Sequence, residues 1–374
     1  MQVDAFGEQA MRRALELARR GEGCVEPNPM VGAVITAADP GADARFVGEG
    51  WHAAFGGPHA EVAALAAAGA AARGATLTVT LEPCCHHGQT PPCTNAIIAA
   101  GIAKVVVATR DPFPAVNGGG IEALRRAGIE VQTGVCAAEA DRLIAPFRML
   151  VERRRPWVIA KWAMSLDGRV ATASRESRWI SSADSRAVAH ELRGRVDAIL
   201  VGIGTAVADD PQRPPGPRRA LRIVLDSTAR LPVDSRLVQT AGDLPVLVAT
   251  GPAAPAERIR ALEAAGCEVW RGAAADCLVR LQDLLAELGS RRLTNLLVEG
   301  GPTVLGSLAD LRSIDEVWAF IAPRLIGGAA APSPVDGSGI VALATAPAID
   351  VEHVSRPGGD LFVRGVTTWP ACRG

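Results

Sequence analysis

Four side chains between His59 and Cys93 have the types and the spacing of a metal centre that performs chemistry. His59 and Glu61 lie two residues apart, and two cysteines, Cys84 and Cys93, follow after an alanine-rich run. One imidazole and two thiolates supply three ligands to Zn²⁺ and leave a fourth position open for water, which is typical of a catalytic rather than a structural site. Glu61 would then carry protons beside the ion without binding it.

Taken singly, each of these residues is more often structural, because a buried cysteine usually serves as a small apolar side chain. The alternatives are therefore a structural zinc ion or an accidental cluster. The joint pattern favours a catalytic site, since His-x-Glu opens an expected helix and Glu-Pro-Cys ends an expected strand. The choice of cysteine stays open, because Cys85, His86 and His87 follow Cys84 directly. We prefer Cys84, and the two histidines are either exposed loop residues or substrate contacts.

The elements that must position these residues alternate between strand and helix. His59 and Glu61 fall in the first turn of their helix, where the helix dipole is positive. The alternation predicts an α/β sandwich with helices on both faces of the sheet. Strands are expected at 30–36, 46–51, 76–81, 104–109 and 129–133, and helices at 4–20, 58–72, 94–100, 120–127 and 140–152.

A second α/β unit is predicted after a basic, proline-containing boundary at 153–156, so we divide the chain into domains 1–154 and 155–374. At 374 residues the chain is long enough for two cores. Strands are expected at 157–161, 198–201, 222–226, 246–249, 295–299 and 316–321, and helices at 182–193, 256–265 and 277–288.

Two glycine-containing segments of this second unit, 202–207 and 299–306, each follow an expected strand. Their backbone N–H groups could hold a phosphate, or each could be an ordinary tight turn. Asp226 ends another expected strand, where it could act as the acidic ribose ligand of a dinucleotide site and favour NAD.

Composition narrows the partners and the compartment. A hydrophobic content of 48% and a formal net charge of -1 give no basis for bulk attraction to nucleic acid or to a membrane. The first residues do not form an export signal, so the eight cysteines are expected to be reduced thiols in the cytoplasm. The chain has no tyrosine and only two lysines, Lys104 and Lys161, so each lysine suggests a specific role.

The His-x-Glu and cysteine pattern resembles that of the zinc nucleobase deaminases, in which two residues usually separate the cysteines. Here eight residues separate Cys84 from Cys93. With this longer spacer, segments 27–35, 48–52 and 80–93 look like the bifunctional deaminase-reductase family of riboflavin biosynthesis. The resemblance implies a cytidine-deaminase-like first domain in which Asn28 and His52 touch the substrate. It departs at Gln89, where the family commonly has Lys or Arg.

Segments 161–168, 176–180, 204–211, 222–227 and 298–303 resemble the reductase half of the same family. The resemblance implies a dihydrofolate-reductase-like fold that uses NADPH rather than a Rossmann fold that uses NAD, and it implies that Lys161 lies close to the substrate. The rarity of lysine supports Lys161 as a catalytic, electrophilic or proton-donating group, and the alternative is a boundary lysine in an ion pair. The cofactor contacts that it implies are Ala163, Trp179, Thr205, Asp209, Ser227, Gly301, Pro302, Thr303, Val304, Leu305, Gly306 and Ser307. The substrate contacts that it implies are Ser177, Arg193 and Glu299. The loop that usually carries a phosphate-binding arginine differs here, and Arg213, Arg218 or Arg219 could reach the phosphate instead. Residues 212–215 depart from the family's Leu-Thr-x-Arg, so Arg193 is the preferred phosphate anchor.

The function expected from the resemblance is zinc-dependent deamination of 2,5-diamino-6-ribosylamino-4(3H)-pyrimidinone 5′-phosphate, followed by NADPH reduction of its ribosyl group to ribityl. One alternative is a mono-functional zinc deaminase of nucleobases or nucleosides whose second domain binds a nucleotide without turnover. We expect a small-molecule substrate, no nucleic-acid or membrane partner, and a homo-oligomer.

Overall fold

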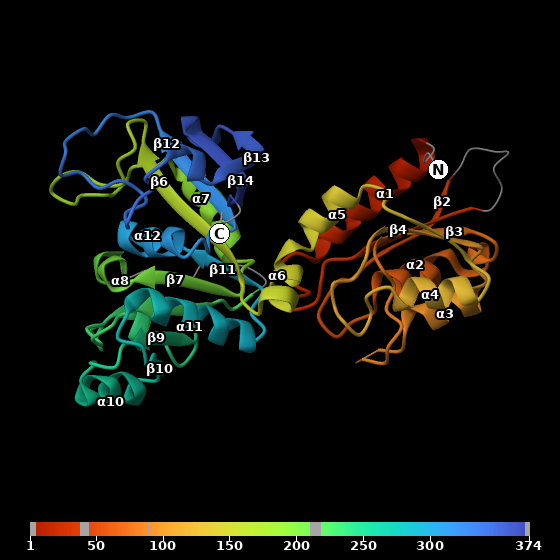
Figure 1. The fold of residues 1–374 in the computed structure, drawn as a ribbon, viewed down its shortest axis with the longest axis horizontal. Coiled ribbons are helices and arrows are strands. Elements are labelled where there is room, and N and C mark those ends of the chain that lie inside the picture. The colour runs from red at the N-terminus through yellow and green to blue at the C-terminus, as the bar shows by residue number, and fades with distance from the viewer. Residues whose placement is uncertain (1–4, 38–44, 89, 210–217, 371–374) are drawn as a thin grey trace. The chain divides into compact units, whose positions relative to one another are not determined.

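The computed structural model of the protein describes residues 5–37, 45–88, 90–209 and 218–370. The chain divides into two compact units, Met1–Arg154 and Arg155–Gly374, and each unit is built on a sheet of its own (Figure 1). Among the described residues, no helix has both the length and the apolar character needed to cross a membrane.

The first unit contains a five-stranded sheet in the order β2-β1-β3-β4-β5. Strand β1 pairs antiparallel with β2 and β3, whereas β3, β4 and β5 run parallel. Its strands are β1 (Gly32–Thr36), β2 (Phe46–Trp51), β3 (Thr76–Leu81), β4 (Lys104–Thr109) and β5 (Glu130–Thr133). Its helices are α1 (Ala5–Ala18), α2 (Ala60–Ala68), α3 (Cys93–Ala100), α4 (Gly119–Arg126), α5 (Ala137–Leu143) and α6 (Ala145–Arg153).

Helices cover both faces of this sheet, as the alternation of strand and helix predicts. Successive side chains of a strand point to opposite faces, and β1 shows this clearly. Ala33 and Ile35 pack into the core formed with α2, α3 and α4, whereas Val34 packs into the core formed with α1 and α5.

The predicted helix 140–152 is in fact two helices, α5 and α6, separated at Ile144. Pro146 lies in the first turn of α6. Proline has no N–H group and clashes with the preceding turn, so it is tolerated at a helix start and not in its interior. The chain therefore begins a new helix at this position.

The second unit contains a nine-stranded sheet in the order β10-β9-β8-β7-β11-β6-β12-β14-β13. All pairs are parallel except those that β14 makes with β12 and β13. Its strands are β6 (Trp157–Ser165), β7 (Ala198–Gly202), β8 (Leu221–Leu225), β9 (Val246–Thr250), β10 (Glu268–Arg271), β11 (Asn295–Val298), β12 (Glu316–Ala322), β13 (Ala348–Ser355) and β14 (Leu361–Thr368). Its helices are α7 (Ala183–Arg193), α8 (Ile203–Asp209), α9 (Arg236–Gln239), α10 (Ala256–Ala264), α11 (Cys277–Ser290) and α12 (Pro302–Asp310).

The two faces of this sheet are again filled from different helices. Leucines of α11 and α12 pack on alternate residues of the central strands, such as Leu200 and Ile223. The neighbouring residues, Val201 and Val224, point the other way and pack against α9 and α10. The carboxyl ends of the parallel strands thus lie at one edge of the sheet, which is where open α/β sheets bind ligands.

Candidate active sites

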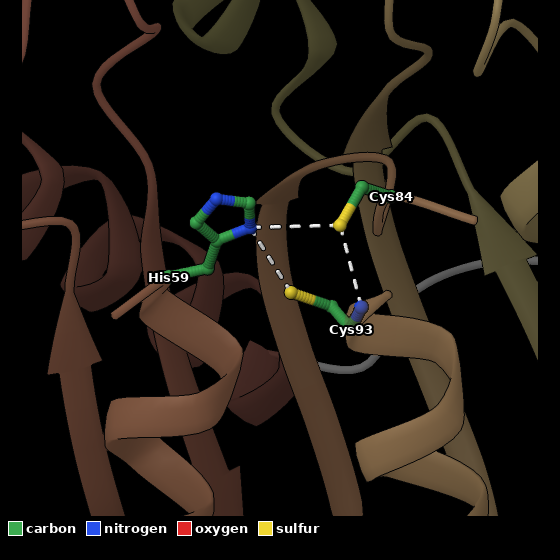
Figure 2. Close-up of side chains that lie close together, drawn as sticks. All are labelled: His59, Cys84 and Cys93. Atoms are coloured by element: carbon green, nitrogen blue, oxygen red, sulfur yellow. Dashed lines mark hydrogen bonds between the residues drawn. The ribbon is translucent and has the colours of Figure 1, made fainter. Parts of the chain in front are cut away.

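The predicted metal ligands converge in the first unit (Figure 2). His59 caps the amino end of α2, and Cys93 is the first residue of α3. His59 Nδ1 lies 3.2 Å from Cys93 Sγ and 3.5 Å from Cys84 Sγ, and the three donor atoms all lie within 4.8 Å of one another. Bonds of about 2.0 Å to nitrogen and 2.3 Å to sulfur place tetrahedral zinc ligands roughly 3.5 Å apart, so these donors fit the ion.

Cys85 points away from this cluster. Its Sγ lies 3.8 Å from the carbonyl oxygen of Ala115, and a Cβ on Gly119 would approach the same sulfur to 3.0 Å. Cys85 therefore packs against the start of α4, and this geometry favours Cys84 as the ligand. Of the two neighbouring histidines, His86 packs against Phe113 with ring centroids 5.8 Å apart, and His87 is exposed.

Glu61 lies beside the two sulfurs and is buried, at 3% exposure. Burial raises the pKa of this carboxyl to about 7. The hydrogen bond from Cys93, followed by that from His59, lowers the pKa of Cys84 to about 4, so this sulfur is a thiolate. The hydrogen bond that the Cys93 thiol makes with Cys84, together with burial, raises the pKa of Cys93. The site thus combines a ready thiolate ligand with a carboxyl able to hold a proton.

Asn28 and His52 form a second pair beside the metal ligands. His52 Nδ1 donates to the carbonyl oxygen of Pro58 over 3.0 Å, which leaves Nε2 to accept a 3.2 Å hydrogen bond from Asn28 Nδ2. The ring of His52 packs edge-on against that of His59, with centroids 5.4 Å apart. Burial is the main cause that lowers the pKa of His52, so the ring is neutral. One residue not singled out from the sequence, Thr90, places its hydroxyl 3.4 Å from His59 Nε2.

A buried carboxylate two residues before Cys84 anchors this part of the site. Glu82 is 3% exposed, and its two oxygens accept hydrogen bonds of 2.9 to 3.3 Å from four backbone N–H groups, those of Asp111, Gly118, Gly120 and Ile121. A Cβ on Gly120 would lie 2.0 Å from the Pro83 carbonyl oxygen, so only glycine allows this approach. The start of α4 therefore holds the chain immediately before Cys84.

In the second unit, three predicted residues form a charged cluster at the carboxyl end of β11. Arg193, at the end of α7, donates to both carboxylate oxygens of Glu299, at 2.6 Å from Nε and 2.8 Å from Nη2. Lys161 Nζ lies 3.6 Å from Glu299 Oε1. Burial would raise the pKa of Glu299, but the charges of Lys161 and Arg193 outweigh it and the net effect lowers that pKa. The Nε–Nη2 edge of Arg193 is engaged, so a phosphate would meet its remaining N–H groups.

His190, which the sequence did not single out, also belongs to this cluster. Its Nδ1 lies 3.0 Å from Arg193 Nη1. Burial lowers the pKa of His190, and the charge of Arg193 adds to this effect. His190 and Arg193 are three positions apart on one helix and therefore share a face, and this spacing could have indicated their contact from the sequence.

The predicted cofactor residues occupy the carboxyl edge of the nine-stranded sheet. Helix α8 begins directly after β7, and three residues separate the end of the adjacent strand β11 from the start of α12. A Cβ on Gly301, the cap of α12, would lie 3.7 Å from Thr205 Oγ1, so the two glycine-containing segments meet. Gly301 is the N-cap of α12 and Pro302 is its first residue, and Thr303, Val304, Leu305, Gly306 and Ser307 continue the helix. Thr205 belongs to α8, so most of the glycine-containing segment 202–207 is helical rather than an ordinary tight turn.

The remaining predicted residues are spread around this edge. Ala163 lies on β6 opposite Phe320 of β12, and Ser177 is exposed. Trp179 is 61% exposed, with the Arg186 guanidinium 4.3 Å from its ring centroid. Arg213 and Gln89 lie outside the described residues, as does the side chain of Asp209.

Asp226 does not occupy the position of an acidic ribose ligand. Its side chain is 1% exposed and accepts a 2.7 Å hydrogen bond from the N–H of Leu231. The neighbouring Ser227 is exposed instead. The alternative reading of Asp226 as an NAD-selecting carboxylate is therefore not supported by its geometry.

Two family models match the chain. Residues 5–109 match the cytidine and deoxycytidylate deaminase zinc-binding region, and residues 156–363 match the RibD C-terminal domain. The riboflavin biosynthesis protein RibD of Actinobacillus pleuropneumoniae is 39% identical over 96% of this chain and 95% of its own length. That of Escherichia coli is 38% identical over 95% of this chain and 97% of its own.

Solved structures agree along almost the whole chain. Acinetobacter baumannii RibD, form 1, is 34% identical, with a TM-score of 0.83 over 97% of this chain and 99% of that one. A diaminohydroxyphosphoribosylaminopyrimidine deaminase/5-amino-6-(5-phosphoribosylamino)uracil reductase from Thermotoga maritima is 36% identical, with a TM-score of 0.79 over 96% of this chain and 98% of that one. The predicted fold class, a deaminase-like domain followed by a reductase domain, is confirmed.

Proposed function

The chain belongs to the RibD family of bifunctional deaminase-reductases of riboflavin biosynthesis, and we propose how its residues share the two reactions. It is a zinc-dependent deaminase and an NADPH-dependent reductase acting on a small-molecule substrate. We assign deamination to domain 1–154 and reduction to domain 155–374. The substrate proposed is the diaminopyrimidinone ribosylamino 5′-phosphate, as the name of the Thermotoga maritima relative suggests.

The deaminase assignment is supported by one observation, the close group of His59, Cys84 and Cys93 with a buried, unligated Glu61 beside it. A zinc ion held by these three residues would supply an activated water for attack on the ring carbon that carries the amino group. Glu61 would take a proton from that water and return it to the departing ammonia. Asn28 and the neutral His52, fixed in one orientation by their hydrogen bonds, would position the pyrimidine.

The reductase assignment is supported by the cluster of Lys161, Arg193 and Glu299. Bound NADPH would supply the hydride that C1′ of the opened ribose receives. Lys161 would polarise or protonate the group that is reduced. Glu299 would hold Lys161 and Arg193 in place beside the substrate, while the starts of α8 and α12 offer backbone N–H groups to cofactor phosphates. For the 5′-phosphate of the substrate, we propose Arg193 as the main contact and Arg213 as a second one.

The direct test follows both reactions on the purified chain. We expect ammonia release from the diaminopyrimidinone phosphate, its loss on chelation of zinc, and oxidation of NADPH once the deaminated intermediate is present. An enzyme that releases ammonia but never oxidises NADPH would show that the second domain binds without turnover. Deamination of free cytidine in place of the pyrimidine phosphate would instead refute the substrate.

We infer that the protein is a homo-oligomer. Strand β13 ends the order of the nine-stranded sheet, and Ile349, Val351 and Val354 on it are 38%, 51% and 57% exposed. An exposed apolar edge strand is a template for pairing with another chain, so a second copy is the partner proposed. Light scattering should report a dimer or larger assembly, and Val351→Lys should shift it toward the monomer. A monomeric wild-type protein would refute this inference.

A cytoplasmic location is proposed on chemical grounds. Cys84 and Cys93 bind metal as reduced sulfurs, and the cytoplasm keeps thiols reduced. All seven cysteines among the described residues are free. Cell fractionation checks the compartment, and recovery of the active enzyme from an oxidising compartment would contradict it.

A further inference from the structure

A buried arginine reaches the carboxyl ends of β8, β9 and β10, beside a residue proposed to contact the cofactor. Arg280 belongs to the first turn of α11 and is 9% exposed. A Cβ on Gly272 would lie 2.8 Å from its Cδ, and one on Gly251 would lie 3.3 Å from its Cζ. The side chain therefore passes between the glycines that follow β9 and β10, in a channel that excludes larger residues.

The guanidinium of Arg280 is held by neutral acceptors. Its Nη1 donates to the carbonyl oxygens of Ala274 and Ala275 at 2.7 and 2.6 Å, and its Nη2 contacts Cys277 Sγ and Ser227 Oγ, both at 3.1 Å. Within the described part of the chain, no carboxylate forms an ion pair with it. A buried charge without a counter-ion is costly, so the site favours an anion nearby.

The hydrogen bond from Arg280 determines what Ser227 can do. A serine hydroxyl has one hydrogen to donate. Because an Oγ lone pair already accepts from Arg280, and no other partner of this hydroxyl is found among the described residues, the hydrogen of Ser227 is directed to solvent, where Ser227 is exposed. It is therefore an oriented donor, polarised by a cation, and suited to an anionic oxygen.

The turn that contains Ser227, residues 226–231, is also electropositive. Its one carboxylate, Asp226, is turned into the protein to accept the N–H of Leu231. Arg230, 62% exposed, lies 3.8 Å from that carboxylate, and the exposed Arg258 places Nη1 3.4 Å from the carbonyl oxygen of Thr228. The surroundings thus favour a phosphate over an uncharged ribose hydroxyl.

We propose that the turn after β8 holds the 2′-phosphate of NADPH, with Ser227 as the hydrogen-bond donor and Arg280 as the positioning residue that orients the Ser227 hydroxyl. This inference rests on the proposed cofactor contact of Ser227. The 2′-phosphate is the group that distinguishes NADPH from NADH, so the pair sets the choice of cofactor.

The test measures binding by calorimetry, without turnover, for adenosine 2′,5′-bisphosphate and for adenosine 5′-monophosphate. Wild-type protein should prefer the bisphosphate. Arg280→Met and Ser227→Ala should each lower bisphosphate affinity about tenfold or more, the scale of a charge-assisted hydrogen bond, and leave monophosphate affinity unchanged. Because Arg280 acts through Ser227, the double variant should lose little more than either single variant.

Two further variants keep the result interpretable. Arg280→Lys retains the charge and should recover part of the preference, even where Arg280→Met is less stable. Arg291→Met removes the same charge at the other end of α11, where Arg291 pairs with Glu268 and Glu287, and should change neither affinity. If Arg280→Met weakens the binding of both nucleotides equally, Arg280 has a packing role. That result would overturn this inference but not the proposed cofactor contact of Ser227. A wild-type protein without any preference would overturn the proposed cofactor contact of Ser227 as well.

Discussion

The zinc site and the reductase site differ in how their residues are gathered. The three zinc donors come from one stretch of 35 residues, 59–93, and lie within 4.8 Å of one another. The reductase residues extend from Lys161 to Ser307, and lie on or directly after several parallel strands. A metal ion requires its donors to converge, whereas a dinucleotide is long and is contacted along its length. The first site is therefore compact and the second distributed, and substitutions should separate the two activities.

The largest separation is expected when a metal ligand is removed. Cys84→Ser should abolish zinc binding and ammonia release, because a hydroxyl is a poor zinc ligand, while NADPH oxidation with the deaminated intermediate continues. Cys85→Ser is the matched control and should keep both zinc and activity, since Cys85 faces Ala115. Metal analysis and the two assays check this. Zinc retained in Cys84→Ser but lost in Cys85→Ser would reverse the ligand assignment.

Removing the proposed proton carrier should affect chemistry alone. Glu61→Gln should keep zinc but slow ammonia release by about a thousandfold, within the range for a general acid-base group. Reductase activity should be unchanged. A variant that keeps its zinc and its full rate of ammonia release would favour a structural zinc site.

A single substitution in the reductase site should cause a smaller loss of activity than removal of a metal ligand, because the reductase contacts are shared among many residues. Glu299→Gln leaves Lys161 and Arg193 without their common carboxylate, and we expect the kcat/KM of reduction to fall about a hundredfold. Ammonia release from the same variant is the internal control. Equal loss of both activities would point to misfolding.

The same variant has a pH signature. The pKa of Glu299 is lowered in the folded protein: burial alone would raise it, but Lys161 and Arg193 outweigh burial. Its stabilising contribution is therefore present above the unfolded pKa and is lost as pH falls through the folded pKa. The difference in free energy of unfolding between wild type and Glu299→Gln should shrink on acidification, measured by urea denaturation. A difference that grows in acid would contradict this sign.

The smallest effect concerns a carboxyl packed beside Glu82. Burial, with the nearby charges of Glu82 and Cys84, raises the pKa of Asp111 from 3.8 to about 6. Stability from this group is full below the unfolded pKa and declines as pH rises through about 6. Asp111→Asn can still accept the N–H of Phe113, so it should stabilise the protein at neutral pH by on the order of 1 kcal/mol. If Asp111→Asn and the wild type have the same free energy of unfolding at neutral pH as well as in acid, measured by urea denaturation, the prediction is wrong.

The sequence predicts the compact site better than the distributed one, for physical reasons. Metal chemistry restricts residue type and spacing, so His59, Glu61 and Cys84 can be recognised in a single stretch. The residues that contact these ligands cannot be recognised in the same way. The hydrogen bond between Thr90 and His59, for example, depends on how the segment between Cys84 and Cys93 folds. Arg280 lies 53 residues after its partner Ser227, and only the parallel pairing of β8 with β9 and β9 with β10 brings them together.

The fold shows the same contrast. Strongly apolar strands such as β7 and β9 were predicted, whereas β13, whose burial pattern is exposed throughout most of its length, was not. Its register shifts between Val351 and His353, which breaks the alternation that would identify a strand. Its place in the sheet comes from pairing with β14 rather than from its own sequence.

The anchoring of Glu82 has a consequence for protein engineering. Cys84 is secured from one side by the four N–H groups that Glu82 accepts, and Cys93 is secured from the other as the first residue of α3. The two ends of the segment between Cys84 and Cys93 are therefore held in place independently of each other. Except at Thr90, which contacts His59, changes of residue within this segment should alter which aminated ring the enzyme accepts and leave the metal donors in place.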